Sequence, residues 1–411
     1  MAYRTQAMIV FEKPSEKWTV HPRMVKLGID NLFSKKMIGL AKRMGLLAHP
    51  ASINKNYKHT LDLLLEKGVK VTQLFGPEHG LFGTAQDMVG CDSQTDPRTG
   101  LPVASLYGNH FDSLSPKAEH LKNIDILVCD LQDVGSRYYT FIYTIALCMK
   151  ACAQKNIPVV VLDRPNPING VTLEGPLLQP GFESFVGLFS GIPVRHAFTV
   201  GELALYFNTE HKIHCDLTVV SMKGWKRSMY YDDTDLPWIN PSPNMPSLET
   251  ALVYPGMCLV EATEVSEGRG TTKPFELAGA PFIEPDKLVA SLEKEKLPGV
   301  VFRPTWFRPM FQKWAGIDCG GIQLHITNQK TFKSFATGLA FIKHVAKLYP
   351  QDFQWRSKTY EFVDTIPAID LLTGSAQIRE SLPSLNIEKL ERKSLKSLKL
   401  IYNLYKKYHI Y

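Results

Sequence analysis

The chain has 411 residues, of which 44% are hydrophobic and 21% are charged, with 28 glycines and 27 prolines. These proportions are typical of globular proteins, and they exclude collagen-like, coiled-coil and intrinsically disordered chains. The formal charge of +7 mildly favours anionic ligands but is ordinary for an enzyme, and we expect no nucleic-acid partner. At about 150 residues per domain, the length predicts two or three domains.

The seven cysteines are scattered, mostly within apolar runs, which is unlike a disulfide framework and predicts reduced, buried thiols. No apolar run approaches the ~18 residues of a membrane span, so we expect no integral membrane segment. Residues 1–18 hold only a short apolar patch before charges resume, which is unlike a signal peptide. We therefore expect a cytoplasmic location, or a periplasmic or secreted one if the N-terminus is mis-set or trimmed.

In chain order, residues 44–163 alternate short apolar runs with helical patterns, which is typical of a doubly wound parallel sheet. The last of these runs is almost wholly apolar and predicts a strand that is buried on both faces. The expected strands are 44–49, 69–75, 103–107, 124–130 and 157–162, and the expected helices are 57–67 and 139–155.

Beyond residue 169 the chain is richer in loops. Residues 236–246 carry four prolines and cannot form regular structure, so we expect an ordered loop or a crossing between domains. The patterns that follow predict a smaller α+β domain, and the basic tail 389–411 predicts a docked amphipathic helix. The expected helices are 201–210, 285–293 and 332–348, and the expected strands are 217–222, 300–306 and 321–327.

Polar clusters follow the expected parallel strands at the point where each strand ends. Ligands bind outside the carboxyl ends of the strands in open α/β sheets, so we expect these side chains to converge on one rim. They include His49, Glu78, His79, Asp130, Asp133, Asp163, Arg164 and Asn166.

Glu78 is the strongest candidate for a catalytic residue. It follows Pro77 in a tight segment between two glycines on the expected rim. Apolar neighbours would disfavour its charged form, which suits a general acid, whereas a helix cap or a solvated loop acid is the structural alternative. His79 beside it could assist or tune the acid.

Acids lie beside arginines at two of these strand ends, with Asp130 and Asp133 before Arg137 and Asp163 before Arg164, and ion pairs are the structural alternative. With Asn166 and Asn169 these groups could form a polar floor for sugar hydroxyls or a carboxylate. The segment 266–272 places Glu267, Arg269 and Thr271 next to two glycines, which allow a ligand to approach the backbone closely. GxGxxG, P-loop, GxSxG and HExxH motifs are absent, so we expect no cofactor and no metal.

Several long motifs occur together and in a fixed order. The sequence closely resembles the NamZ-like exo-β-N-acetylmuramidases of bacterial peptidoglycan turnover, a family long carried as a domain of unknown function. The resemblance runs from about residue 25 to the end. The motifs are GPEHGLFG at 76–83, DLQDVGSRYYTF at 130–141, LDRPNPING at 162–170, VRH at 194–196, WINPSPNMPS at 238–247, ALVYPG at 251–256, SEGRGTTKPFE at 266–276 and LTGSAQIR at 372–379.

The resemblance implies an α/β fold in which a cleft lies between a Rossmann-like doubly wound parallel sheet domain and a smaller α+β C-terminal domain. We expect an N-terminal extension over residues 1–24, a Rossmann-like catalytic domain over 25–240 and a C-terminal domain over 241–411. The implied reaction releases N-acetylmuramic acid (MurNAc) from the non-reducing end of β-1,4-linked MurNAc-GlcNAc peptidoglycan fragments. The implied catalytic residues are Glu78, His79 and Glu267, and the implied substrate-binding residues are Asp130, Arg137, Tyr138, Asp163, Arg164, Asn166, Arg195, Asn244, Arg269 and Thr271.

Glycoside hydrolysis needs a protonated acid and a second group across the sugar ring. Glu78 fits the acid, and the second group is open among Glu267, Asp130, Asp163 and the acetamido group of the substrate. MurNAc carries a lactyl carboxylate that an arginine can bind in a bidentate manner. The candidates for that contact are Arg137, Arg164, Arg195 and Arg269.

Three other functions compete with this one: a non-catalytic muropeptide-binding protein, a hydrolase of another glycan and, more weakly, a nucleotide-dependent oxidoreductase. The sequence leaves open the oligomeric state, the tolerance of peptide stems, and whether hydrolysis is retaining, inverting or substrate-assisted.

Overall fold

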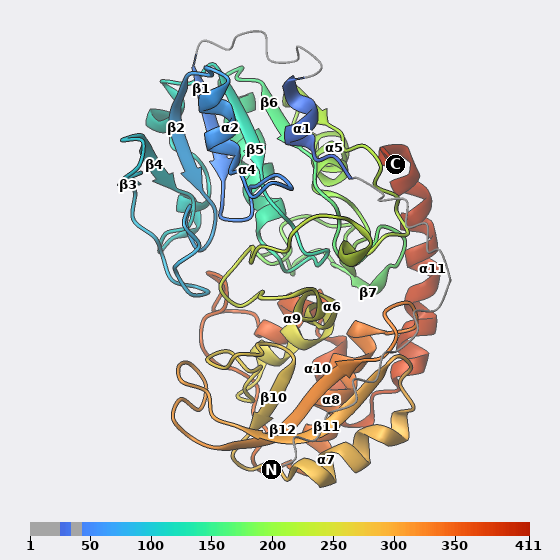
Figure 1. Cartoon of the computed structure of the whole chain (residues 1–411). Helices are drawn as coiled ribbons and strands as arrows, with labels where there is room; N and C mark the ends of the chain where they lie inside the picture. Colours follow the sequence, from blue (N-terminus) through green and yellow to red (C-terminus); the bar gives the residue numbers. More distant parts are fainter. Residues whose placement is uncertain (1–24, 34–42) are drawn as a thin grey trace, which may run out of the picture.

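The computed structural model describes residues 25–33 and 43–411, so the expected N-terminal extension over 1–24 lies outside the described residues. Figure 1 shows two halves, one above the other. The N-terminal half is built on a seven-stranded sheet flanked by helices, and the C-terminal half on a three-stranded sheet. The expected α/β fold with a second, smaller domain is confirmed.

The large sheet has six parallel strands and one short antiparallel edge strand, β3 (Gln94–Thr95). Numbered along the chain, the parallel strands lie in the order 3-2-1-4-5-6, which is the Rossmann order. The order reverses between the first and fourth of them, and ligand sites form beyond the strand ends near such a reversal. The six are β1 (Met44–Ala48), β2 (Val71–Gly76), β4 (Pro102–Ser105), β5 (Ile126–Asp130), β6 (Val159–Leu162) and β9 (Leu217–Val220).

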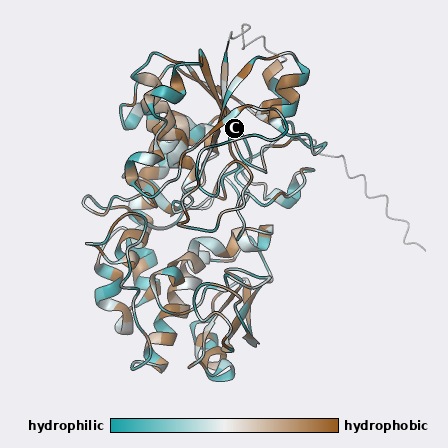
Figure 2. Cartoon of the chain, turned by 90° about the vertical axis from the view of Figure 1, so that its left-hand side faces the viewer, coloured by the Kyte–Doolittle hydropathy of each residue, from teal (hydrophilic) through white to brown (hydrophobic). Residues whose placement is uncertain are grey.

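Both faces of this sheet are covered, which explains the nearly uninterrupted apolar runs. Successive side chains on β1 point to opposite faces, so Leu47 packs with helices α4 (Phe141–Ala153) and α5 (Val200–Glu210). Leu46 packs on the other face with α1 (Gly28–Leu32) and α2 (Thr60–Glu66). In Figure 2 the hydrophobic colour gathers on the strands that lie between these helices.

The C-terminal half packs helices on an antiparallel sheet in the order β10-β12-β11. Its helices α6 and α8 cross with their backbones in contact. The approach is so close that a Cβ on Gly256 would lie 1.8 Å from the carbonyl oxygen of Ser334. The same applies to Gly338, whose Cβ would lie 2.0 Å from the oxygen of Gly256. The elements are α6 (Leu248–Met257), β10 (Leu277–Ala280), α7 (Pro285–Leu292), β11 (Val300–Phe307), β12 (Cys319–Ile326) and α8 (Ser334–Leu348).

The basic tail forms the expected docked helix, α11 (Ile387–Tyr405), which runs along both halves in Figure 1. Leu390 and Leu398 are buried on its packed face, whereas Leu395 is 51% exposed. Beyond the helix the chain ends in the N-terminal half, where the hydroxyl of Tyr411 donates a hydrogen bond to Asp163 Oδ2 at 2.6 Å.

The expected strands and helices are all present, with ends shifted by a few residues, and residues 236–246 contain no helix or strand. Within the described residues no helix is both long and apolar enough to cross a bilayer. All seven cysteines are free, and Cys91 alone is not buried. The sequence patterns missed α1, β3, α3 (Ala118–Leu121), β7 (Glu174–Leu177), β8 (Pro193–Arg195), α6, β10, α9 (Ala368–Thr373) and α10 (Gln377–Ser381).

Asp163 at the end of β6 makes stability depend on pH. Burial raises the pKa of Asp163 from 3.8 to about 7, against hydrogen bonds from Tyr411, Gly201 and Thr199 that favour the charged form. The folded protein therefore holds this proton at pH values where the unfolded chain has lost it, so the free energy of unfolding falls as pH rises from about 4 to about 7.

We predict that Asp163→Asn removes this part of the pH dependence. Denaturant unfolding at several pH values across that range gives the slope of the free energy of unfolding against pH. The control is Asp352→Asn, at an exposed position, which should keep the slope of the wild type. Equal slopes in Asp163→Asn and the wild type would contradict the prediction.

Candidate active site

A tight turn after β2 presents Glu78 at the rim of the sheet. The chain folds back so closely that a Cβ on Gly76 would lie 2.5 Å from the backbone nitrogen of Leu81. His79 and Gly80 both have positive φ, at 70° and 79°, and the amide of Gly80 donates to the carbonyl of Pro77 at 2.9 Å. A positive φ is costly for a histidine, so the surrounding contacts must hold this turn in place.

The carboxyl group of Glu78 points at the start of α4. Its Oε2 accepts a hydrogen bond of 2.6 Å from the hydroxyl of Thr140, the N-cap residue of that helix. Its Oε1 accepts a longer bond of 3.4 Å from the amide of Met88. The positive end of the helix dipole and these two donors stabilise a negative charge at Glu78.

Glu78 opens into a cavity of about 40 Å³ that lies between the two halves. Of the predicted site residues, Glu78, His79, Tyr138, Asn244 and Arg269 line this cavity together. The sequence patterns missed the remaining lining residues, which are Asp87, Tyr139, Thr140, Phe141, Val186, Ser242, Met245, Tyr254, Glu261, Phe275, Tyr360 and Glu361.

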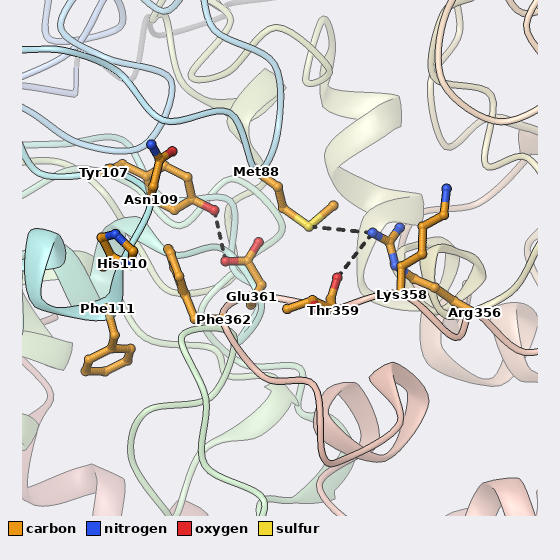
Figure 3. A pocket seen from close by; sticks show the side chains of 11 residues that line it. Met88, Tyr107, Asn109, His110, Phe111, Arg356, Lys358, Thr359, Glu361 and Phe362 are labelled. Carbon is orange, nitrogen blue, oxygen red and sulfur yellow. Dashed lines mark hydrogen bonds between the residues drawn. The ribbon is translucent and has the colours of Figure 1, made fainter.

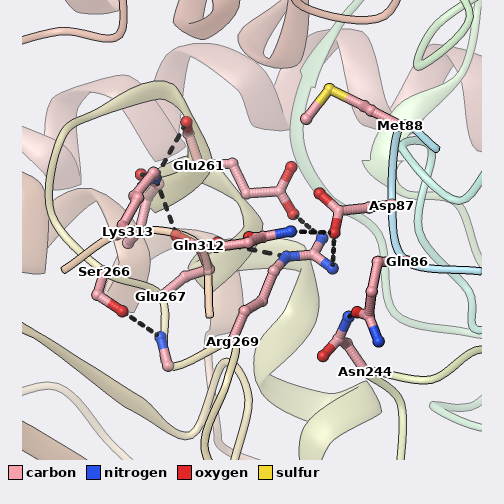
Figure 4. Close-up of polar contacts among 12 residues, drawn as sticks. Gln86, Asp87, Met88, Asn244, Glu261, Ser266, Glu267, Arg269, Gln312 and Lys313 are labelled. Carbon is pink, nitrogen blue, oxygen red and sulfur yellow. Dashed lines mark hydrogen bonds and ion pairs between the residues drawn. The ribbon is translucent and has the colours of Figure 1, made fainter. Parts of the chain in front are cut away.

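Arg269 is the centre of an ion cluster (Figure 4). Its guanidinium lies 3.1 Å from Asp87 Oδ1, 2.5 Å from Glu261 Oε1 and 3.3 Å from Glu267 Oε1. Lys313 adds a second cation, with its Nζ 2.8 Å from Glu267 Oε2. Burial lowers the pKa of Arg269, but the three carboxylates outweigh it and the pKa is raised well above its usual value. Arg269 is therefore a fully paired cation.

The segment that carries Asp87 holds the two halves together at this cluster. Gln86 accepts a hydrogen bond of 2.8 Å from Asn244, and Asp87 accepts one of 2.6 Å from Gln312 (Figure 4). Thr271 lies outside the cavity, where its hydroxyl donates to the carbonyl of Gly268 and shapes the loop that carries Arg269.

A second, larger cavity of about 660 Å³ adjoins the first, and Glu361 lines both (Figure 3). The hydroxyl of Tyr107 donates to Glu361 Oε2 at 3.1 Å. Burial, together with the neighbouring carboxyl group of Glu78, raises the pKa of Glu361 well above its usual value. The φ of Glu361 is positive, at 45°, which indicates a constrained backbone. No sequence motif around Glu361 predicts its place in the site.

Asp130 and Arg164 form a buried ion pair away from the cavity. Arg164 Nε lies 2.5 Å from Asp130 Oδ1, Nη2 lies 2.8 Å from Oδ2, and Thr60 donates to the same carboxylate. Both side chains are almost fully buried, at 1% and 3% exposure. The pair joins the ends of β5 and β6 and supports the sheet beneath the site.

The other predicted residues lie on the N-terminal half and make structural contacts. Arg137 donates to the backbone carbonyls of Pro176, Ile192 and Leu372. Arg195 pairs with Glu174 at 2.7 Å. Asn166 bonds the backbone of Phe198 and Ile168, and Asp163 caps the start of α5 through the amide of Gly201. None of these four side chains lines the cavity around Glu78, and their predicted substrate contacts stay predictions.

Comparison with known proteins decides the family. Models of the N-terminal and C-terminal parts of exo-beta-N-acetylmuramidase NamZ match residues 44–249 and 252–411. This chain belongs to the NamZ family. The resemblance drawn from the motifs is confirmed, while the domain boundary expected at residue 240 stays a prediction.

A named protein and two solved structures align with nearly the whole chain. The peptidoglycan beta-N-acetylmuramidase NamZ of Bacillus subtilis (strain 168) is 47% identical over 404 residues, which are 97% of this chain and 94% of that protein. Crystal structures of two DUF1343 family proteins from Bacteroides fragilis NCTC 9343 have TM-scores of 0.83 and 0.73, at 36% and 28% identity. Each alignment covers 94% of this chain and 99% of the other.

We predict that Asp130→Ala destabilises this NamZ family member by about 3–5 kcal/mol, because it leaves the buried Arg164 without its counter-ion. Denaturant unfolding measures the change in the free energy of unfolding. The matched control is Asp318→Ala, which breaks the exposed pair with Arg308 and should change stability too little to measure. Equal losses in both variants would contradict the assignment of Asp130 to the core.

Proposed function

We propose that this chain is an exo-acting glycoside hydrolase that releases MurNAc from the non-reducing end of β-1,4-linked MurNAc-GlcNAc peptidoglycan fragments. Membership in the NamZ family and the 47% identity to the Bacillus subtilis enzyme support this reaction class. The single observation that carries the mechanism is the position of Glu78. The residue is 6% exposed and lines the cavity, and its carboxyl group faces the start of a helix.

Glu78 is the general acid in this proposal. As the bond between C1 of MurNAc and O4 of GlcNAc breaks, Glu78 gives its proton to O4 and becomes negatively charged. The hydroxyl of Thr140, the amide of Met88 and the end of α4 are already in place to stabilise that charge. No reorganisation is needed at the moment of proton transfer.

The contacts of the other carboxylates reduce the number of candidates for the second group in the reaction. Asp130 and Asp163 lie outside the cavity, and Glu267 is held by two cations. Among the described carboxylates that line the cavity, Asp87 and Glu261 are paired with Arg269, whereas Glu361 forms no ion pair. Glu361 and the acetamido group of the substrate are the two candidates for this role.

A disaccharide assay tests the proposal. Purified protein is incubated with MurNAc-GlcNAc and, separately, with a GlcNAc-terminated disaccharide, and free MurNAc is measured by mass spectrometry. We expect release from the first substrate alone. Cleavage of both would favour a broader hexosaminidase, and binding without cleavage would favour a muropeptide-binding protein. The expected cytoplasmic location stays a prediction.

We predict that Glu78→Gln lowers kcat on MurNAc-GlcNAc by about 10²- to 10⁴-fold, because the amide cannot deliver the proton. Substrate binding, measured by calorimetry, and the unfolding midpoint should stay close to those of the wild type. Glu249→Gln, at an exposed position on α6, is the matched control that keeps full activity. Wild-type turnover by Glu78→Gln would remove Glu78 from the mechanism.

We predict that Thr140→Val lowers kcat by roughly 10- to 100-fold, the effect expected when one hydrogen bond to a charged group is lost. KM should change little, because the hydroxyl is needed most when Glu78 becomes charged in the transition state. Thr140→Ser keeps the donor and should retain most of the activity. A rise in KM alone, or an equal loss in Thr140→Ser, would show that Thr140 acts in another way.

A further inference from the structure

The proposed substrate carries a carboxylate. The arginines found in the sequence motifs do not explain how that carboxylate is recognised. Arg164, Arg195 and Arg269 already pair with acidic side chains. Arg137 is fully buried against backbone carbonyls. A carboxylate on the substrate needs a cation that is not already neutralised and that faces the site.

Among the arginines in the described part of the chain, Arg137, Arg303 and Arg356 are the three without a carboxylate within ion-pair distance. Arg303 lies on the exposed strand β11, where it bonds to Gln323. Arg356 lines the larger cavity next to the site. Elimination therefore leaves Arg356 as the arginine that is available to an anionic ligand.

The guanidinium of Arg356 is held in place by weak contacts. Its Nη2 lies 3.4 Å from the carbonyl oxygen of Thr359 and 3.9 Å from the sulfur of Met88, and its buried Nε has no hydrogen-bond partner. The guanidinium carbon lies 5.6 Å from the ring centre of Tyr360. The side chain is thus positioned, while much of its donor capacity is unused.

The larger cavity arranges its groups in an order that suits an acidic sugar (Figure 3). Arg356 and Lys358 lie at one end, the rings of Phe111 and Phe362 lie at the other, and Glu361 lies between them. Aromatic rings of this kind can pack against a sugar. Burial raises the pKa of Glu361, which reduces its repulsion of an anion beside it.

Met88 connects this cation to the catalytic acid. Its amide donates to Glu78 Oε1 at 3.4 Å, and its sulfur contacts Arg356. One methionine therefore spans the space between the guanidinium and the carboxyl group that donates the proton. Glu78 and Arg356 thus contact the two ends of the same residue, which places a cation close to the catalytic acid.

We propose that Arg356, with Lys358 beside it, binds a carboxylate of the muramoyl residue and thereby selects MurNAc over GlcNAc at the site. This inference rests on the proposed function. The carboxylate has two sources, which are the free lactyl group of MurNAc and the end of a peptide stem attached to that lactyl group.

The test compares three substrates: MurNAc-GlcNAc, its lactyl methyl ester, and MurNAc-GlcNAc with a peptide stem that has a free terminal carboxylate. We expect the ester to lower wild-type kcat/KM by roughly 10- to 100-fold relative to the free acid, the range for one charge-assisted contact. Arg356→Met should cause a similar loss on the free acid, mainly through KM. It should add no further loss on the ester, because the same contact is already missing.

Two further variants serve as controls. Arg303→Met removes an arginine from the exposed strand β11 and should leave all three activities as in the wild type. Arg356→Lys keeps a positive charge and should restore part of the activity on the free acid. A loss for Arg356→Met that is confined to the stem-bearing substrate would assign the contact to the peptide carboxylate.

Two outcomes would overturn the inference. In the first, the wild type cleaves the acid and the ester equally well, and Arg356→Met loses no activity on the stem-bearing substrate. In the second, Arg356→Met loses the same activity on all three substrates. Binding of free MurNAc, measured by calorimetry, separates this inference from the proposed function. If the wild type binds MurNAc without cleaving any substrate, the hydrolase proposal fails, and weaker binding by Arg356→Met still supports the contact. Equal binding by both proteins would then overturn it.

Discussion

The enclosed cavity depends on the ion pairs that the buried guanidinium of Arg269 makes. It pairs with Asp87 from the N-terminal half and with Glu261 and Glu267 from the C-terminal half. Three largely shielded carboxylates in one place would repel each other, and each would resist removal from water. Arg269 and Lys313 offset that cost, and in doing so they hold the walls of the cavity at a fixed distance.

This constraint explains how residues from distant parts of the chain face one another. Glu78 stands on a turn at the rim of the large sheet, and Glu361 comes from the loop after α8. The bond from Tyr107 to Glu361 closes a separation of 254 positions along the chain. Burial of two carboxyl groups in one cavity then raises the pKa of Glu361, so the electrostatics follow from the joining of the halves.

Much of this architecture is predictable from the sequence, because it follows from local patterns. Strands buried on both faces are apolar throughout, and the turn around Glu78 is marked by proline and glycines. Helix α6 was missed because Pro255 and Gly256 read as helix breakers, although Gly256 is required where α6 crosses α8. Glu361 carried no signal because its importance arises only when the two halves pack.

The arginines show the same limit. Asp163 and Arg164 are neighbours in the sequence, yet Arg164 pairs with Asp130, 34 positions earlier, and Asp163 accepts the hydroxyl of Tyr411. Burying a guanidinium is costly unless most of its donors are satisfied, and tertiary packing decides where that occurs. Sequence can therefore identify the arginines near a site but not those whose charge is free for a ligand.

The return of the C-terminal tail to the N-terminal half bears on how the molecule is made. Tyr405, Tyr408 and Tyr411 donate hydrogen bonds to Gly191, Glu210 and Asp163, all of which belong to the half that is synthesised first. Domains usually fold in order as they leave the ribosome. Because residues 405–411 pack on the first half, that half completes its packing only after these residues have been synthesised.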